Sequence, residues 1–291
     1  KHLGTLDDYK ALSHALHAQG MVLVQDIVLN HTGNFFGYPG PWSAGQPAVG
    51  WEANAGARPS PAPTQPPFDL NDPRKPAHRA ANIYHWTPDV RDFTNPQQVL
   101  NWQMSGLDDL NTENPAVRRA LRQSYGHWVR EVGVDGFRLD TAFYVPPALM
   151  HDFLRSPDPA APGIERVARA TGREAFYTFG EGFGIDKPYA TTQAHRIERY
   201  VRSQGARTGR PLMQGMLHFT LYGSLGDVLA RGAPTAVLGH RITQSQRVHS
   251  DPHRMATFVD NHDVDRFLAG GTDAGLRQAL LALMTLPGVP V

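Results

Sequence analysis

The sequence predicts an α/β fold, a (β/α)8 barrel of the TIM type with a small domain inserted after its first visible strand. Segments with helical periodicity alternate with short apolar segments along most of the chain, and one long aperiodic segment interrupts this alternation. Helices that alternate with buried strands are typical of βα units around a parallel sheet. For a chain of 291 residues, a barrel is the expected closure of such a sheet.

The first predicted unit is a helix followed by a strand. Thr5 and Asp8 have the spacing of a helix N-cap pair, and apolar residues then recur at helical spacing until Gly20. Residues 21–29 follow as a nearly continuous apolar and β-branched segment, which is typical of a strand buried on both faces of a parallel sheet.

The same alternation continues through the rest of the chain. Asn114 and Pro115 form a cap and first turn, and an apolar stripe then predicts a helix up to Val132. Another helix is predicted up to Met284, before the Pro287-Gly288 break. Further strands are predicted at residues 134–139, 175–179, 213–219 and 255–259.

Residues 32–108 have no strong periodicity and are rich in Pro, Gly, Asn and Trp. A structureless loop of this length is uncommon in a compact domain, so we expect a small inserted domain. The predicted organisation is a barrel formed by residues 1–31 and 109–291, with residues 32–108 as the insert. Since the chain opens on Lys1 and stops in a segment that resembles the start of a strand, we expect a barrel that lacks both ends.

The composition argues against several classes of partner. The chain has 28 basic and 27 acidic residues, so no charge excess points to nucleic acid. No apolar segment is long enough to span a bilayer, so we expect no membrane partner. The absence of cysteine excludes disulfides. The sequence leaves the oligomeric state open.

Polar residues that could carry chemistry follow four of the predicted strands. They are Asp26, Asn30 and His31 in the first, Arg138 and Asp140 in the second, Glu181 in the third, and Asn261, His262 and Asp263 in the fourth. The carboxyl ends of barrel strands face one common mouth, so we expect these side chains to converge there.

Three convergent carboxylates, Asp140, Glu181 and Asp263, predict the cleavage or transfer of glycosidic bonds. That chemistry needs one protonated acid at the leaving oxygen and one carboxylate at the oxocarbenium-like centre. Arg138 lies two residues before Asp140, on the same face of the strand, and can keep Asp140 ionised as a nucleophile.

The chain resembles the α-amylase superfamily, glycoside hydrolase family 13. The resemblance rests on residues 26–31 (DIVLNH), 136–140 (GFRLD), 180–181 (GE) and 258–263 (FVDNHD), with residues 107–111 (LDDLN) similar to a further family region. It covers nearly the whole chain, and it places the insert after the third barrel strand.

The resemblance implies a role for each matching residue. Asp140 would be the nucleophile, Glu181 the general acid and base, and Asp263 a stabiliser of the distorted sugar. Sugar-binding roles would fall to His31, Arg138, His262, Tyr144 and Phe183, with Asp26 supporting them from behind.

The resemblance also implies a structural Ca²⁺ between barrel and insert, with Asn30 and Asp109 as ligands and a contribution from the backbone oxygen of Tyr144. The alternative is that Asn30 only caps a turn and that Asp109 is a solvated loop acid.

The sequence departs from the family pattern just after Asp140. Many members have Lys-His three and four residues after the nucleophile, where this chain has Phe143 and Tyr144. The expected activity is retaining hydrolysis of α-1,4-glucosidic bonds in starch-like glucans or maltooligosaccharides. The departure leaves open an α-glucan transglycosylase, or a cyclomaltodextrinase or sucrose-acting enzyme.

A non-catalytic sugar-binding homologue is a rival of another class. Such proteins usually lack one of the carboxylates, and all three are present here. An extracellular or periplasmic location is the family-level expectation, because polymeric glucan lies outside most cells.

Overall fold

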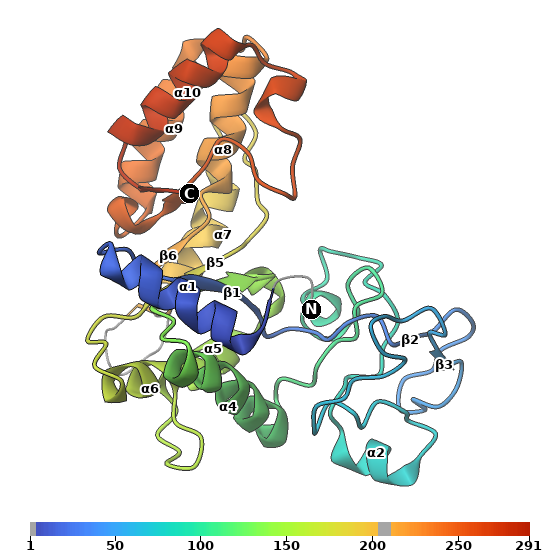
Figure 1. Ribbon diagram of the computed structural model, residues 1–291. Helices are drawn as coiled ribbons and strands as arrows, with labels where there is room; N and C mark the ends of the chain where they lie inside the picture. The colour runs from blue at the N-terminus through green and yellow to red at the C-terminus, as the bar shows by residue number, and fades with distance from the viewer. Residues whose placement is uncertain (1–3, 203–210) are drawn as a thin grey trace. The chain divides into compact units, whose positions relative to one another are not determined.

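The computed structural model describes residues 4–202 and 211–291 (Figure 1). The chain divides into two compact units, Lys1–Phe176 and Tyr177–Val291. The predicted alternation of helices with short parallel strands is present in each of these units. The division into a barrel of residues 1–31 with 109–291 and an insert of residues 32–108 stays a prediction.

The first unit begins with α1 (Leu6–Ala18) and β1 (Val24–Val28). A capping box starts the helix: the Thr5 hydroxyl accepts a hydrogen bond from the Asp8 amide at 3.2 Å, and the Asp8 carboxylate accepts one from the Thr5 amide at 2.7 Å. The predicted helix is confirmed. The strand is shorter than the predicted residues 21–29.

The second helix–strand pair of this unit is α4 (Pro115–Glu131) and β4 (Gly136–Asp140). The Asn114 side chain caps α4 by accepting a hydrogen bond from the Ala116 amide at 2.8 Å. β1 and β4 pair in parallel, with Asp26 opposite Arg138. Helix and strand are therefore confirmed, and their register places charged residues side by side.

Two further helices, α5 (Pro147–Arg155) and α6 (Ile164–Ala170), pack against α4 and against each other (Figure 1). Arg122 of α4 is buried between them, where it pairs with Asp152 and donates a hydrogen bond to the Ala161 carbonyl at 2.7 Å. Charge and backbone contacts thus fix the helical layer that covers β4.

Residues 32–108 contain four short elements and an aromatic core. The elements are β2 (Phe36–Gly37), β3 (Glu52–Ala53), α2 (Pro76–Ala81) and α3 (Pro96–Asn101), and β2 pairs with β3 in antiparallel fashion. Phe36 is buried against Trp51, Tyr84 and Trp86, with ring centroids 5.3–6.0 Å apart. These aromatic side chains form the core of this segment.

The second unit contains short parallel strands and longer helices. They are β5 (Tyr177–Gly180), α7 (Thr192–Val201), β6 (Gly215–Met216), α8 (Phe219–Leu225), the π-helix η2 (Gly226–Ala230), α9 (Thr235–Val248), β7 (Ala256–Thr257), α10 (Asp273–Thr285) and β8 (Val289–Pro290). β5 pairs with β6 in parallel, and β7 pairs with β8 in parallel. Figure 1 shows α8, α9 and α10 grouped together in this unit.

The predicted strand at residues 213–219 is correct only at its centre. β6 ends at Met216, and α8 begins at Phe219. The cause is local: the imidazole of His218, itself fully buried, accepts a hydrogen bond from the Leu221 amide at 3.3 Å and so caps the helix. Phe219 then packs edge-on against Phe258 in the core of the unit.

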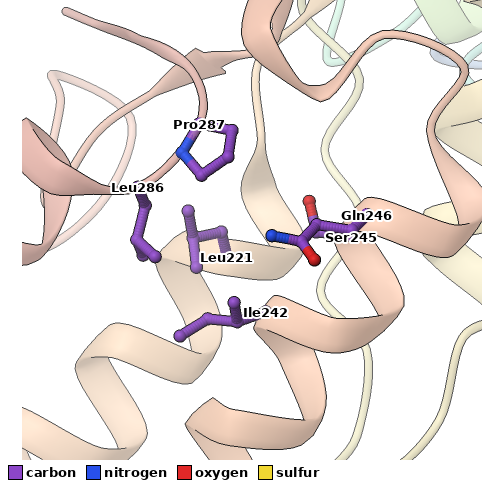
Figure 2. A pocket seen from close by; sticks show the side chains of 6 residues that line it. All are labelled: Leu221, Ile242, Ser245, Gln246, Leu286 and Pro287. Carbon is purple, nitrogen blue, oxygen red and sulfur yellow. The ribbon is translucent and has the colours of Figure 1, made fainter.

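A small cavity of about 10 Å³ lies between α8, α9 and the segment after α10 (Figure 2). It is lined by Leu221, Ile242, Ser245, Gln246, Leu286 and Pro287. A volume of this size holds at most one water molecule. The Ser245 hydroxyl already bonds to the buried His218 imidazole at 2.7 Å, so the cavity is a packing gap.

Within residues 4–202 and 211–291, no helix combines the length and the apolar character that crossing a membrane requires.

Tyr125 of α4 ties β1 to the helical layer, and its removal tests this anchor. Its hydroxyl donates to the Val28 carbonyl at 2.7 Å and accepts from the Val28 amide at 3.1 Å. We expect Tyr125→Phe to lower the free energy of unfolding of the full-length protein by about 1–2 kcal/mol, because both backbone groups lose a buried partner. Chemical denaturation measures this, and an unchanged midpoint would contradict the anchoring role.

Candidate active site

A cluster of one arginine and two carboxylates lies at the end of the β1–β4 pair. Arg138 Nη1 is 2.9 Å from a carboxylate oxygen of Asp26 and 2.9 Å from Oδ1 of Asp140. Arg138 and Asp140 are two residues apart on β4 and so project to the same face, while Asp26 is the register partner of Arg138 on β1. The structure therefore brings these three predicted residues together.

The Arg138 guanidinium is held as a cation between these two acids. Burial alone would lower the pKa of Arg138, but the hydrogen bonds and charges of Asp140 and Asp26 outweigh it and raise that pKa. The side chain of Arg138 is 12% exposed, whereas that of Asp26 is 52% exposed. The stronger of the two pairs is thus the one with Asp140, which is less open to solvent screening.

His31 lies just beyond β1, where the negative charge of Asp140 acts on its imidazole. Burial lowers the pKa of the His31 imidazole, and the negative charge of Asp140 acts in the opposite direction. Because burial dominates, His31 is neutral at neutral pH, and a neutral imidazole can both donate and accept a hydrogen bond. The structure thus places His31 within the electrostatic reach of Asp140.

The two predicted metal ligands lie side by side. The Asn30 side-chain amide is 3.3 Å from Oδ1 of Asp109, and both residues are buried. Asp109 also bonds to Nδ1 of His85, whose Nε2 is 3.0 Å from Glu113. Asp109 is therefore a buried, hydrogen-bonded carboxylate and not the solvated loop acid of the alternative interpretation.

The segment around Asp109 joins the start of the insert to its end. The Leu110 amide donates to the Asn30 carbonyl at 2.9 Å, and the Asn111 amide donates to the Ile83 carbonyl at 2.8 Å. His31 and Asp109 form an antiparallel bridge. The backbone that carries Asn30 and His31 is consequently fixed by the far end of the insert.

Asp108 lies in the segment 107–111, and the structure gives it a role that the sequence did not reveal. Its buried carboxyl group accepts hydrogen bonds from the amides of Phe35 at 3.1 Å and Phe36 at 3.3 Å. Burial raises the pKa of Asp108 to about 8, although these hydrogen bonds act against that rise. The side chain therefore anchors the start of β2.

Phe143 and Tyr144 lie in η1 (Ala142–Tyr144), the 3-10 helix directly after Thr141, and α3 packs against this helix. Phe143 is only 4% exposed, whereas Tyr144 is partly exposed. The departure from Lys-His thus adds one accessible aromatic ring rather than two.

Glu181 belongs to the second unit, where it directly follows β5. It is 9% exposed, in a strand end that is fixed by the hydrogen bond from the Leu217 amide to the Gly180 carbonyl at 2.8 Å. Phe183 is 54% exposed, and its ring lies 4.8 Å from that of Phe219. A buried acid thus comes two residues before an exposed aromatic ring.

His262 and Asp263 lie next to each other in the second unit, with Nε2 of His262 3.3 Å from Oδ2 of Asp263. The Asp263 amide donates to the Asn261 side chain at 2.9 Å. β7 ends at Thr257, earlier than the predicted residues 255–259, so Asp263 lies in the loop beyond the strand.

This loop is closed by a second contact. Asp260 accepts hydrogen bonds from Arg266 at 2.8 Å and from the Phe267 amide at 2.9 Å, which holds both ends of the segment that carries Asp263. An open hollow of about 270 Å³ adjoins this segment. It is lined by Tyr222, Gly226, Ala230, Arg231, Val259, Asp265, Arg266, Phe267, Ala269 and Gly270.

Comparisons with known proteins identify the family of the chain. The model of the alpha amylase catalytic domain matches residues 1–208, which is more than half of the chain. The chain belongs to the α-amylase family.

Individual proteins of this family are also similar to the chain. A β/α-amylase of Paenibacillus polymyxa is 28% identical over 303 residues, which cover 100% of this chain and 20% of that protein. A cyclomaltodextrin glucanotransferase of Geobacillus stearothermophilus is 24% identical over 289 residues, covering 99% of this chain and 34% of that protein. The chain thus spans 20% and 34% of the length of these two relatives.

Solved structures confirm the predicted fold class. The α-amylase of Geobacillus thermoleovorans in complex with acarbose matches with a TM-score of 0.69 and 25% identity, over 99% of this chain and 52% of that one. The chain therefore has the α/β fold of the α-amylase TIM barrel and spans about half the length of that structure.

Asp26 and Arg138 of the charge cluster in β1 and β4 should contribute unequally to the free energy of unfolding. We expect Asp26→Asn to lower the free energy of unfolding by less than about 1 kcal/mol, because Asp26 is half-exposed and screened. Arg138→Met should cost about 3 kcal/mol, because it leaves two carboxylates side by side without their buried cation. Denaturant titrations of the full-length variants measure both values, and equal losses would contradict this ranking.

Proposed function

We propose that the chain carries the catalytic residues of a retaining glycoside hydrolase that cleaves α-1,4-glucosidic bonds in starch-like glucans or maltooligosaccharides. The observation that carries the proposal is the Arg138 cation held between Asp26 and Asp140 at the end of β4. In a chain of the α-amylase family, this arrangement prepares Asp140 to act as an oriented nucleophile.

The proposed reaction has two steps. Asp140 attacks the anomeric carbon while Glu181 protonates the departing glycosidic oxygen, which gives a covalent glycosyl-enzyme. Glu181 then takes a proton from a water molecule that displaces Asp140, so the anomeric configuration is retained. Asp263 stabilises the distorted sugar through hydrogen bonds to its hydroxyl groups.

Several neighbours would bind the sugar at the cleavage point. The neutral imidazole of His31 suits a sugar hydroxyl, because it can donate one hydrogen bond and accept another. His262, which is exposed beside Asp263, would bind the same sugar unit. Phe183 and Tyr144 would contact the sugar on the leaving-group side, and Phe183 offers the more open ring.

Transfer to a sugar acceptor in place of water is the second candidate. It is favoured by the absence of the usual Lys-His pair at Phe143 and Tyr144, and by the similarity to a cyclomaltodextrin glucanotransferase. Because Phe143 is buried, the change in acceptor chemistry comes from lost positive charge and from the single ring of Tyr144.

An extracellular or periplasmic location forms part of the proposal, since an enzyme that acts on polymeric glucan must meet it outside the cytoplasm in most cells. Separating a culture into medium, periplasm and cytoplasm would test it, and activity confined to the cytoplasm would contradict it.

Product analysis of the full-length protein with maltoheptaose tests the reaction. We expect short products with the α-anomeric configuration at the earliest times, and Glu181→Gln should lower kcat by at least about a hundredfold because the departing oxygen loses its proton donor. Glu174→Gln is the matched control, since Glu174 is an exposed acid shortly before β5. Its kcat should equal that of the wild type.

Each outcome of this experiment supports or excludes one of the proposed reactions or roles. Products longer than maltoheptaose would support transfer. β-Anomers as the first products would exclude retention, and a Glu181→Gln variant with full activity would exclude the acid–base role. No turnover of any α-glucoside would overturn both hydrolysis and transfer.

We further propose that Asn30 and Asp109 bind a structural Ca²⁺. Both side chains carry an oxygen atom that suits such an ion in a buried setting, and the ion would need the Asn30 amide turned so that its oxygen replaces the nitrogen that lies 3.3 Å from Asp109. Burial raises the pKa of Asp109 to about 7 even though His85 acts in the opposite direction, and a nearby divalent cation would stabilise the ionised form. The ion would join the end of β1 to the end of the insert.

Thermal unfolding with and without EDTA tests the metal. We expect EDTA to lower the Tm of the full-length protein by several degrees and added Ca²⁺ to restore it, because an ion that binds only the folded state stabilises it. Asn30→Ala should remove this dependence on Ca²⁺, whereas Asn101→Ala, at an amide in α3 that is not part of the pair, should keep it. A Tm that EDTA leaves unchanged would exclude the site.

A further inference from the structure

The loop between β5 and α7, residues 181–191, carries three exposed apolar side chains directly after Glu181. They are Phe183 (54% exposed), Ile185 (41%) and Tyr189 (56%). A loop that follows a parallel strand lies at the carboxyl end of that strand, the end at which barrel enzymes bind substrate. Exposed apolar side chains on such a loop point to a ligand with apolar faces.

A buried ion pair clamps this loop. Nη1 of Arg241 is 3.1 Å from Oδ2 of Asp186, and the two side chains are 2% and 1% exposed. Arg241 also donates to the Ala190 carbonyl at 3.0 Å, while Asp186 accepts the Gln193 amide at 2.7 Å. One arginine of α9 therefore holds the loop at its middle and near its end, so the exposed side chains are presented on a fixed backbone.

The loop runs along α8. The Phe183 ring lies against Phe219, and Ile185 contacts Gly223 so closely that a Cβ there would be 2.5 Å from Cγ2 of Ile185. Phe219 and Gly223 are four residues apart on one helix, which corresponds to about 6 Å along its axis. Phe183 and Ile185 thus lie about one helical turn apart along α8, and Tyr189 follows them in the same loop.

Tyr189, in the same loop, has an unusual backbone conformation. Its φ is +64°, and the Ala190 amide donates to the Lys187 carbonyl at 3.0 Å across a turn with Pro188 in second place. In such a turn, the residue after proline needs a positive φ, and glycine is the residue that adopts it without strain. A tyrosine here costs backbone free energy that glycine would not.

The Tyr189 ring is braced on one side only. It meets the ring of His240, in α9 next to Arg241, at a centroid distance of 5.3 Å and an angle of 68°. More than half of the residue stays exposed, so burial in the core does not offset the strain. An interaction that forms when a ligand is present accounts for both the strain and the exposure.

We propose that Tyr189 binds an α-glucan chain by stacking on a sugar ring beyond the cleavage point, farther along the loop than Phe183. The proposal rests on the proposed glucan activity. A tyrosine ring braced by one neighbouring ring offers a rigid apolar face with little rotamer freedom to lose, and its hydroxyl can bond to a sugar hydroxyl. The clamp by Arg241 and Asp186 sets the position of this face before the glucan arrives.

Substitution of Tyr189 by glycine separates binding from folding, because glycine suits the turn. In the full-length protein, we expect Tyr189→Gly to raise the KM for maltoheptaose about tenfold, as the loss of one stacked ring allows. The KM for maltotriose, which is too short to reach the outer ring, should change less than twofold, and the Tm should stay equal or rise. Tyr189→Phe keeps the ring and should stay close to wild type with both substrates.

Phe93→Ala is the control for loss of an exposed aromatic ring, since Phe93 is 60% exposed in the insert. It should leave both KM values unchanged. An unchanged KM for maltoheptaose in Tyr189→Gly would overturn the inference. An equal loss with both substrates together with a lower Tm would assign Tyr189 a structural role and overturn it as well.

Equilibrium binding of maltoheptaose, measured by calorimetry, separates this inference from the proposed function. If the wild type binds maltoheptaose without cleaving it and Tyr189→Gly binds it about tenfold more weakly, the binding role of Tyr189 is supported and the hydrolase proposal is contradicted. If the wild type does not bind maltoheptaose, both fall. If it cleaves maltoheptaose and both proteins bind it equally, only the Tyr189 inference falls.

Discussion

The parallel register of β1 and β4 is the constraint on which the chemistry of the first unit depends. It places Asp26 opposite Arg138 and Val28 opposite Asp140, so that one guanidinium reaches both acids. Side chains alternate across a strand, and a slip of one residue would move Arg138 to the other face and leave the carboxylates without a cation. The hydroxyl of Tyr125 adds a second check on this register, because it bonds to both backbone groups of Val28.

The insert contributes to the same site through its ends rather than its core. Residues 107–111 bond to Asn30 on one side and to Ile83 on the other, so the backbone that presents His31 is fixed only when the insert has closed. The buried Asp108 holds the start of β2 by accepting hydrogen bonds from two backbone amides. The aromatic core of residues 32–108 and the backbone of Asn30 and His31 are therefore linked through residues 107–111.

Periodicity and caps predicted the local elements well, since α1, α4 and β4 depend on residues close in sequence. The shared face of Arg138 and Asp140 followed from strand alternation alone, and the roles that the family motifs imply for the strand-end residues stay predictions. Contacts between distant residues could not be predicted in this way. The pair of Asp186 and Arg241 joins positions 55 residues apart, and no periodic signal marks either residue as buried. The start of α8 was missed because a histidine cap is rare among helix starts.

The proposed function assigns roles to two kinds of residue, and the structure holds them in different ways. Arg138 and Asp140 are set by strand pairing, which tolerates little change without loss of the sheet. Phe183 is set by a loop whose shape comes from one buried arginine, so its aromatic surface can change by substitution while the strands stay intact. Since Phe143 is buried, the proposed function assigns the acceptor side mainly to that loop. Under that proposal, the residues at the anomeric carbon and those on the acceptor side are held by separate contacts and can vary independently.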